Sequence, residues 1–407
     1  MSPSRVRGGL GLAAAGAALL AVCACASSTS PAGQPAATSK PAATGKPAAI
    51  SKPAPTSKPA AIGKPAASSA LALNDWALAG QHVIYSYSGL TAPSGLLQRI
   101  RLGQVAGVIF FASNISSKTQ IASVIKQFEQ AASSSPLKAP LLLEVDQEGG
   151  LVRRLPGAPL LSEKQIGQST DPGGQAASAG TGAGNNLLSV GMNVNLAPVV
   201  DFYRQAGDFY DQFQRSYSMS ASTAGALSAD FVRAQQATGV AATAKHFPGL
   251  ASASSTQNTD LRPVTLNDSS TRITSLDELP YKSAIAAGVK IVMPNWASYP
   301  NIGSKRPAGL SSKVVQGQLR RSLGFTGVIE TDAIGAGGLS QYGGHGNRSI
   351  LATIAGDDLV LSAGQSVNDG VYITSKLVEA YRNATVDRTA FQASAQRVIS
   401  LRSSLPG

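Results

Sequence analysis

The stretch LLLEVDQEGG, residues 141–150, decides the fold that we predict. It begins with a run of large apolar residues, and the run ends at Asp146 before a Gly-Gly pair. A nearly continuous apolar run is typical of a parallel strand that is buried on both faces. The stretch therefore predicts a central strand with a carboxylate at its carboxyl end.

Seven other runs of this kind occur along the chain from about Leu71, two before this stretch and five after it. Amphipathic stretches lie between most of them. Examples of these stretches are residues 117–133, 223–238 and 311–324. Eight strand–helix units over about 330 residues predict a single (β/α)8 TIM barrel, an α/β fold. A doubly wound open sheet is the alternative, but no glycine-rich phosphate fingerprint follows the first run. The eight predicted strands are HVIYSY (82–87), GVIFFA (107–112), LLLEVD (141–146), VNLAPVVD (194–201), AATAKH (241–246), VKIVMPN (289–295), GVIETD (327–332) and DLVLSA (358–363).

Polar side chains gather at the carboxyl ends of these predicted strands, whereas mid-strand positions are almost all apolar. Active sites of such barrels lie at the carboxyl ends of the strands. A single carboxylate could serve as a loop cap or a salt-bridge partner, but five strand ends share the pattern. The residues are Asp146, Asp201, Lys245 with His246, Asn295 and Asp332.

The residue types at these ends favour sugar chemistry. No Gly-x-Ser-x-Gly elbow stands in a strand-to-helix context, so a serine hydrolase is not indicated. The chain has three histidines, no His-Glu-x-x-His motif and no cysteine after Cys25, so we expect no metal and no other cofactor. Several carboxylates beside Arg and Lys suit a retaining glycosidase, which needs a carboxylate nucleophile and a separate acid/base.

Four motifs together resemble glycoside hydrolase family 3, most closely its single-domain bacterial β-N-acetylglucosaminidases. The resemblance covers about residues 72–365, and the motifs occur in the family's order. It implies a (β/α)8 barrel without the second sandwich domain of the larger β-glucosidases. The motifs are EVDQEGGLVRRLPG (144–157), LAPVVDF (196–202), AKHFPG (244–249) and LGFTGVIETDAIGAGGL (323–339).

The resemblance also implies roles for individual residues. Asp332 in ETDA falls on the nucleophile, although Thr331 and Ala333 depart from the usual Ser-Asp-Asp of this branch. Arg153 could face the site in place of Arg154, and Arg215 could instead be a surface residue. The residues matched to sugar binding are Asp146, Arg154, Arg215, Lys245 and His246.

The loop after AKHFPG departs from the family. The branch normally carries an Asp and a His there as its acid/base pair, but Gln257 and Thr259 occupy those positions. Neither an amide nor a hydroxyl can act as a general acid. Asp260 is one alternative, if its pKa rises from about 3.9 to about 6. His345 is a second alternative, because histidine titrates near neutral pH. A site that binds glycans without a competent acid is the third, with Asp260 then a turn or cap residue beside Asn258.

The beginning of the chain predicts export. Residues 1–25 combine Arg5 and Arg7 with a short apolar core and VCAC, which resembles a lipobox with Cys25 as the acylated residue and Cys23 as the alternative. A plain secretory signal is the other interpretation. Residues 26–70 form a linker that we expect to be disordered, since residues 39–68 repeat a Lys-Pro-Ala unit five times. The barrel domain then spans residues 71–407.

The formal charge of +12 does not indicate a nucleic-acid partner. Two arginines and five lysines lie in residues 1–70, which contain no acidic residue, so about +5 remains on the rest of the chain. We expect a monomer that a lipid holds on the extracytoplasmic face of a membrane, or a secreted protein. Its function would be retaining hydrolysis of terminal β-N-acetylglucosaminides, with cell-wall glycan fragments as substrate. The alternatives are a glycan-binding lipoprotein and a family 3 glycosidase for another sugar.

Overall fold

The computed structural model describes residues 73–407, which belong to one compact unit. The predicted leader, Cys23, Cys25 and the Lys-Pro-Ala repeats lie outside the described residues. Within residues 73–407, no helix combines the length and the apolar character needed to cross a bilayer.

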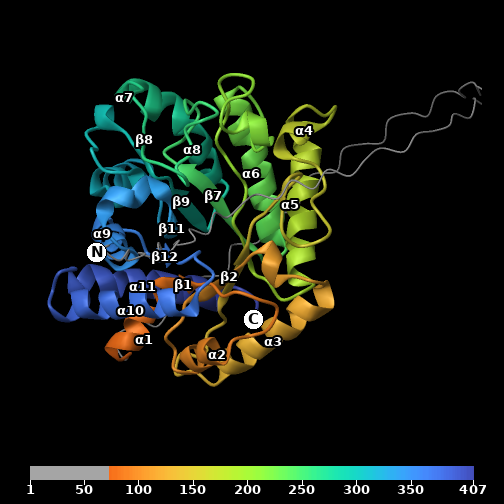
Figure 1. Cartoon of the computed structure of the whole chain (residues 1–407). Coiled ribbons are helices and arrows are strands. Elements are labelled where there is room, and N and C mark those ends of the chain that lie inside the picture. Colours follow the sequence, from red (N-terminus) through yellow and green to blue (C-terminus); the bar gives the residue numbers. More distant parts are fainter. Residues whose placement is uncertain (1–72) are drawn as a thin grey trace, which may run out of the picture. The chain divides into compact units, whose positions relative to one another are not determined.

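Eight parallel strands close into a barrel at the centre of this unit (Figure 1). The neighbours around the barrel run in the order β1-β12-β11-β9-β7-β6-β3-β2. β1 pairs with both β2 and β12, so the sheet has no free edge and the open-sheet alternative is wrong. All eight predicted strands are confirmed. They are β1 (Val83–Tyr85), β2 (Gly107–Phe110), β3 (Leu142–Val145), β6 (Val194–Asn195), β7 (Ala241–Phe247), β9 (Ile291–Pro294), β11 (Val328–Ala333) and β12 (Leu359–Leu361).

The interior of the barrel is filled by apolar side chains on alternate strand positions. One buried cluster takes a member from almost every strand, including Ile109, Val194 and Ile291. Side chains alternate between the two faces of a strand, so these positions share the inward face with the strand-end polar residues. The prediction that mid-strand positions are apolar has exceptions on the inward face, namely Glu144 in β3, Thr243 in β7 and Glu330 in β11, which are all fully buried.

Helices surround the strands (Figure 1). The predicted helical stretches at 117–133 and 223–238 are confirmed, and Ser117 and Ser220 cap their first turns through side-chain oxygens. The stretch at 311–324 forms a π-helix, Lys313–Ser322, which brings buried residues five positions apart onto one face. The α-helices are α1 (Asp75–Gly80), α2 (Ser94–Arg101), α3 (Lys118–Ser133), α4 (Glu163–Gly167), α5 (Pro172–Leu188), α6 (Ala221–Ala237), α7 (Ser270–Arg272), α8 (Leu279–Ala286), α9 (His345–Ala355), α10 (Val367–Arg382) and α11 (Arg388–Ser404).

Small elements decorate the loops that follow the strands. β4 (Gln147–Gly149) and β5 (Val152–Arg153) form an antiparallel hairpin directly after β3. β8 (Val264–Thr265) and β10 (Ala297–Ser298) form a parallel pair that joins the loops after β7 and β9. Short helical turns are η1 (Ala112–Asn114), η2 (Asp211–Phe213), η4 (Pro300–Ile302), η5 (Ala308–Leu310) and η7 (Gly337–Tyr342), with a second π-helix at Ile273–Asp277.

A buried carboxylate, Asp358, ties the amino-terminal end of the barrel together. It precedes β12, and one of its oxygens accepts from the backbone N–H of Ile329 in β11 at 2.9 Å. Arg320 donates to the same oxygen, while Arg397 and Ser394 of α11 donate to the other at 2.8 and 2.7 Å. Two strands, the π-helix and the last helix therefore depend on one charge.

We predict that Asp358→Asn lowers the free energy of unfolding by about 3 kcal/mol, because two arginines then lose a buried counter-charge. The matched control is Asp230→Asn, which breaks the exposed pair with Arg233 and should change stability by less than about 1 kcal/mol. Urea denaturation at pH 7 measures both. Equal, small losses in the two variants would contradict this account.

Candidate active site

The carboxyl ends of β3, β7 and β11 bring the predicted site residues together on one rim of the barrel. Asp146 follows β3, Lys245 and His246 lie in β7, and Asp332 lies in β11. The Lys245 ammonium donates to Asp146 Oδ1 at 2.7 Å, across the position of β6. Lys245 is 3% exposed, so its charge is held inside the barrel mouth.

A second carboxylate, Glu148, completes this ionic network. It is 2% exposed, lies 2.8 Å from the Lys245 ammonium, and accepts two parallel bonds of 2.8 Å from Arg215. Burial alone would raise the pKa of Glu148, but the charges of Arg215 and Lys245 outweigh it and lower the pKa to about 2. Sequence reasoning missed Glu148, although it stands two residues after Asp146 in the first motif.

The two arginines of the hairpin after β3 differ in their surroundings. Arg153 Nη1 donates to the carbonyl of Gly157 at 2.9 Å, away from the carboxylates. Burial would raise the pKa of Asp146, but the charges of Lys245 and Arg154 lower it. Of the two candidates, Arg154 is thus the one that acts on the site.

His246 is held as a neutral ring in the site. Burial, together with the charges of Lys245 and Arg215, lowers its pKa well below the usual value. Its Nδ1 lies 2.8 Å from the Tyr210 hydroxyl, and its backbone N–H donates to Asp201. Asp201 is 1% exposed, so it supports β7 from within the fold.

Asp332 is half-buried at the end of β11. Its Oδ1 accepts from the backbone N–H of Ala333 at 2.6 Å, and the Thr331 hydroxyl accepts from the N–H of Leu361 at 3.0 Å, which fixes β11 against β12. Burial and then the charge of Asp260 raise the pKa of Asp332 to about 7. The charge of Asp260 thus acts on Asp332.

The loop that carries Asp260 is fastened to the loop after β11. The N–H groups of Gly338 and Gly337 donate to the carbonyls of Thr259 and Asp260, at 2.8 Å each. A Cβ at Gly337 would stand 2.3 Å from the carbonyl oxygen of Leu261, so this close approach requires glycine. The segment that carries Asp260 is thereby fixed to the loop that follows Asp332.

The Asp260 carboxyl itself is unengaged. Asn258 Oδ1 accepts from the Asp260 N–H at 2.8 Å, so Asn258 and not Asp260 supplies the turn interaction. In residues 73–407 we find no hydrogen bond to the Asp260 carboxyl. The residue is exposed, yet the protein around its carboxyl removes enough water to raise its pKa. Gln257 turns back into its own loop, where its Oε1 accepts from Ser254 N.

His345 has a different environment. It begins α9, and its Nδ1 lies 2.7 Å from Asp369, which also accepts from the Ser362 hydroxyl at 2.8 Å. Burial acts most strongly on the pKa of Asp332, and the charge of Asp260 acts next. His345 also lies beside the loop after β11, because a Cβ built at Gly335 would stand 3.5 Å from its Nε2.

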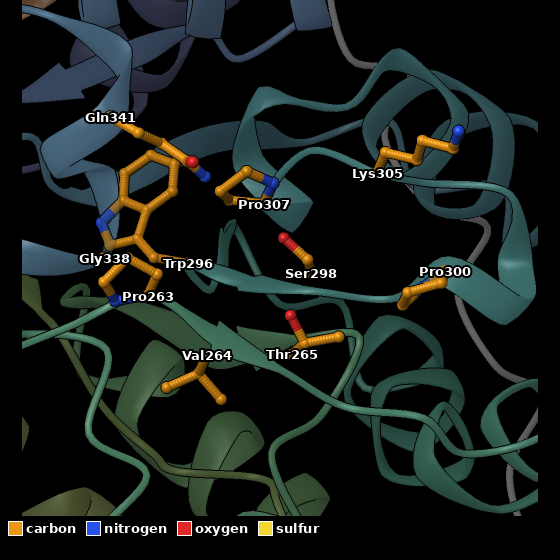
Figure 2. A pocket seen from close by; sticks show the side chains of 10 residues that line it. All are labelled: Pro263, Val264, Thr265, Trp296, Ser298, Pro300, Lys305, Pro307, Gly338 and Gln341. Atoms are coloured by element: carbon orange, nitrogen blue, oxygen red, sulfur yellow. The ribbon is translucent and has the colours of Figure 1, made fainter.

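A groove is lined by Pro263, three residues after Asp260, and by nine other residues (Figure 2). It has a volume of about 180 Å³ and runs between the β8/β10 pair and the turn at 338–341. Trp296, Gly338 and Pro263 group at one end, and Lys305 stands at the other (Figure 2). Lys305 is exposed and has no ion-pair partner in the described part of the chain. The other lining residues are Val264, Thr265, Ser298, Pro300, Pro307 and Gln341.

The carboxylates of the site are arranged for hydrogen bonding and ion pairing with side chains. Across residues 73–407, no group of three or more His, Cys, Asp or Glu side chains is placed to hold a metal ion. The site therefore contains Asp332 as an ionisable carboxylate, Asp260 as a second carboxyl, and the ionic network around Lys245, whose charged groups can bind hydroxyls.

Comparison with known proteins identifies relatives along most of the chain. The family model "Glycosyl hydrolase family 3 N terminal domain" matches residues 95–401. A secreted glycosyl hydrolase of Arthroderma benhamiae is 41% identical over 338 residues, which is 83% of this chain and 95% of that protein. A beta-hexosaminidase of Xanthomonas campestris pv. campestris is 33% identical over 269 residues, which is 63% of this chain and 76% of that protein.

Among solved structures, a glycoside hydrolase family 3 beta-N-acetylglucosaminidase from Paenibacillus sp. str. FPU-7 aligns with a TM-score of 0.77 at 31% identity. The alignment covers 82% of this chain and 63% of that one, so the present chain spans less than two thirds of that relative's length.

We predict that Glu148→Gln lowers the free energy of unfolding at pH 7 by about 3 kcal/mol, because Arg215 and Lys245 lose a buried carboxylate. The pKa of Glu148 is near 4.5 before folding and about 2 after it, so its stabilisation is full above pH 4.5 and fades toward pH 2. Urea denaturation at pH 7, 5 and 3.5 should show the two proteins converging as the pH falls. Glu379→Gln, at an exposed pair with Lys376, is the control. A gap that stays constant over this range would contradict the assignment.

Proposed function

The chain belongs to glycosyl hydrolase family 3, and on this premise we propose that it hydrolyses terminal β-linked N-acetylglucosaminides with retention of configuration. The observation that carries the proposal is the pairing of Asp332 with Asp260. Asp332 lies in β11 and Asp260 lies in the loop after β7, and the charge of Asp260 raises the pKa of Asp332 after the larger effect of burial. A retaining glycosidase needs two such carboxyls with different tasks.

Asp332 is the proposed nucleophile. Its carboxylate oxygen forms a bond to the anomeric carbon as the bond to the leaving oxygen breaks, which gives a glycosyl ester. The Ala333 N–H and the charge of Lys245 both favour the ionised form of Asp332. Water then attacks the anomeric carbon, and the ester bond to Asp332 breaks.

Asp260 is the proposed acid/base. It gives its proton to the leaving oxygen in the first step and takes one from the attacking water in the second. The charge of Asp146 opposes ionisation of Asp260, and partial loss of water at its carboxyl acts in the same direction. The two carboxyls then hold one proton between them, as the mechanism requires.

The remaining matched residues are proposed to hold the sugar. Asp146, Arg154, Lys245 and the neutral His246 offer acceptors and donors to its hydroxyls, and charge-assisted bonds of this kind are stronger than neutral ones. Arg215 is engaged in its paired bonds to Glu148. We therefore assign Arg215 a positioning role, in which it keeps Glu148 and Lys245 in place.

We further propose that the groove of Figure 2 receives the aglycone. The acid must touch the glycosidic oxygen, so the leaving group departs beside Asp260, and Pro263 lines the groove three residues later. The unpaired ammonium of Lys305 favours an aglycone that carries a carboxylate. Muramic acid in cell-wall glycan fragments is such a group, and these fragments are the substrate that we propose.

Export follows from the predicted leader and agrees with the relative from Arthroderma benhamiae, which is a secreted protein. Acylation at Cys25, or at Cys23, would hold the enzyme on the outer face of a membrane. The Lys-Pro-Ala linker would then let the barrel reach the wall.

We predict that the wild type cleaves aryl β-N-acetylglucosaminides with good and with poor leaving groups. Asp332→Ala should abolish cleavage of both, because no ester can form. Asp260→Ala should lower kcat/KM on the poor leaving group by about 10²- to 10⁴-fold and affect the good one far less. His345→Ala is the matched comparison and should spare both substrates. Initial rates at pH 6 with each pair of substrates measure these effects.

Two results would redirect this proposal. If Asp260→Ala behaves as the wild type and His345→Ala loses the poor leaving group, the acid is His345. If the wild type cleaves neither substrate but binds N-acetylglucosamine, and aryl β-glycosides of other sugars are also untouched, the protein is a glycan-binding protein. Cleavage of another aryl β-glycoside alone would instead indicate a family 3 glycosidase of that specificity.

We predict that Lys305→Ala lowers kcat/KM about threefold for a substrate with a carboxylate on its aglycone, since one exposed ionic contact is lost. A neutral aryl substrate should be unaffected, and raising the salt concentration should remove the difference. Lys290→Ala, at the opposite end of β9, is the control. An equal loss on neutral and anionic substrates would contradict an anionic aglycone site.

A further inference from the structure

The layer directly beneath the site is polar, in a barrel whose interior is otherwise apolar. Glu144, Thr243 and Glu330 each lie two residues before a site residue of the same strand, and so share its inward face. We call these three residues the polar floor. All three are 0% exposed. Their strands, β3, β7 and β11, are the ones that carry Asp146, Lys245 and Asp332.

The polar floor has no partners among the other described residues. Both carboxyl oxygens of Glu144, both of Glu330 and the hydroxyl of Thr243 lack a hydrogen bond within residues 73–407. Two ionised carboxylates in such a place would lose several kcal/mol of hydration each, with no cation bonded to either. At least one of the two glutamates must therefore carry a proton.

The two glutamates meet across the barrel. β3 and β11 stand opposite one another in the strand order, and the carboxyls are within hydrogen-bonding reach once one of them is protonated. Burial raises the pKa of both, and the charge of Glu330 raises that of Glu144 further. Burial raises the pKa of Glu330 to about 7, and the hydrogen bond from Glu144 partly offsets that rise. These directions fit a proton on Glu144 that is donated to Glu330.

We propose that Glu144 and Glu330 form a proton-sharing carboxyl pair beneath the nucleophile, and that the charge on Glu330 sets the pH range in which Asp332 becomes ionised. Both are positioning residues, since neither reaches the sugar. The part that concerns Asp332 rests on its proposed role as nucleophile, whereas the shared proton does not depend on any activity.

The surroundings of Glu330 make its effect on Asp332 direct. The charged groups that act on it are Asp146 from β3, Lys245 from β7 and Asp332 from its own strand. Its neighbouring strands, β9 and β12, have no titratable residue within their bounds. In this buried space little solvent screens one carboxylate from the other, so an ionised Glu330 disfavours an ionised Asp332.

The first test is the pH dependence of kcat/KM on an aryl β-N-acetylglucosaminide with a good leaving group. Loss of activity at low pH reports protonation of Asp332. Glu330→Gln keeps the size of the side chain and removes its charge, so the acidic limb should move to lower pH by on the order of one unit. Glu144→Gln still offers an N–H to Glu330, which keeps its charge, so the limb should stay near that of the wild type.

The second test locates the proton without using activity. Infrared spectra at pH 7.5 should contain a carbonyl band of a protonated carboxylic acid that Glu144→Gln removes and Glu330→Gln retains. Glu163→Gln is the matched control for the pH profile, because Glu163 is a buried glutamate of α4 whose Oε1 accepts from Val199 N. It should leave the acidic limb in place.

The proposal is overturned if Glu330→Gln folds and its acidic limb coincides with that of the wild type, or if neither glutamine variant removes a protonated-acid band. An enzyme inactive on every glycoside would refute the proposed function, while the infrared test of the pair would still stand. Each variant has its own readout, so a variant that fails to fold leaves the other able to decide.

Discussion

The ammonium of Lys245 is the interaction on which the site depends. It is buried in the barrel mouth, where it meets Asp146 at the end of β3 and Glu148 in the hairpin that follows. A buried charge is tolerable only when it is paired and hydrogen-bonded. Glu148 in turn holds Arg215 through two parallel bonds, so the loop after β6 is fixed to the same centre. Two cations and two anions from three separate segments thus become one rigid body, which leaves Asp146 partly exposed.

A second set of contacts, made by the loop after β11, fixes the position of Asp260. Arg348 of α9 donates to the carbonyls of Gly343 and Ile334, and the Trp296 ring N–H donates to that of Ala333, so the loop after β11 is well braced. That loop offers two N–H groups to the segment that carries Asp260. The position of Asp260, the proposed acid, is therefore set by backbone contacts with the loop that follows Asp332, the proposed nucleophile. These backbone contacts do not depend on the side chains of the loop after β7. That loop can therefore lack the Asp and His that the family usually carries at positions 257 and 259 and still present the carboxyl of Asp260.

The sequence was a good guide to the barrel and an incomplete guide to the site. Eight apolar runs located eight strands, because a strand buried on both faces is mostly apolar along its length. Asp146, Lys245 and Asp332 could be grouped from the rule that parallel strands end on one rim. Glu148 could not, because its partner Arg215 lies 67 residues further along and only folding brings them together. The sequence also could not predict where the Asp260 carboxyl lies. A shift of one residue in the loop decides which side chain points toward the barrel mouth.

Glu144 and Glu330 show why the site cannot be understood from the rim alone. Carboxyls outnumber cations there, with Asp146, Glu148, Asp260 and Asp332 facing Lys245, Arg215 and Arg154. Any further negative charge in the barrel interior must then be neutralised by a proton, because the low dielectric leaves no other means. Glu144 and Glu330 form a layer directly below the rim carboxylates. A proton gained or lost in this layer changes a charge that solvent cannot screen from Asp332. On the proposed mechanism, the protonation of Asp332 thus depends on two layers of the barrel, and the residues that set it include Glu330, which lies beneath the rim.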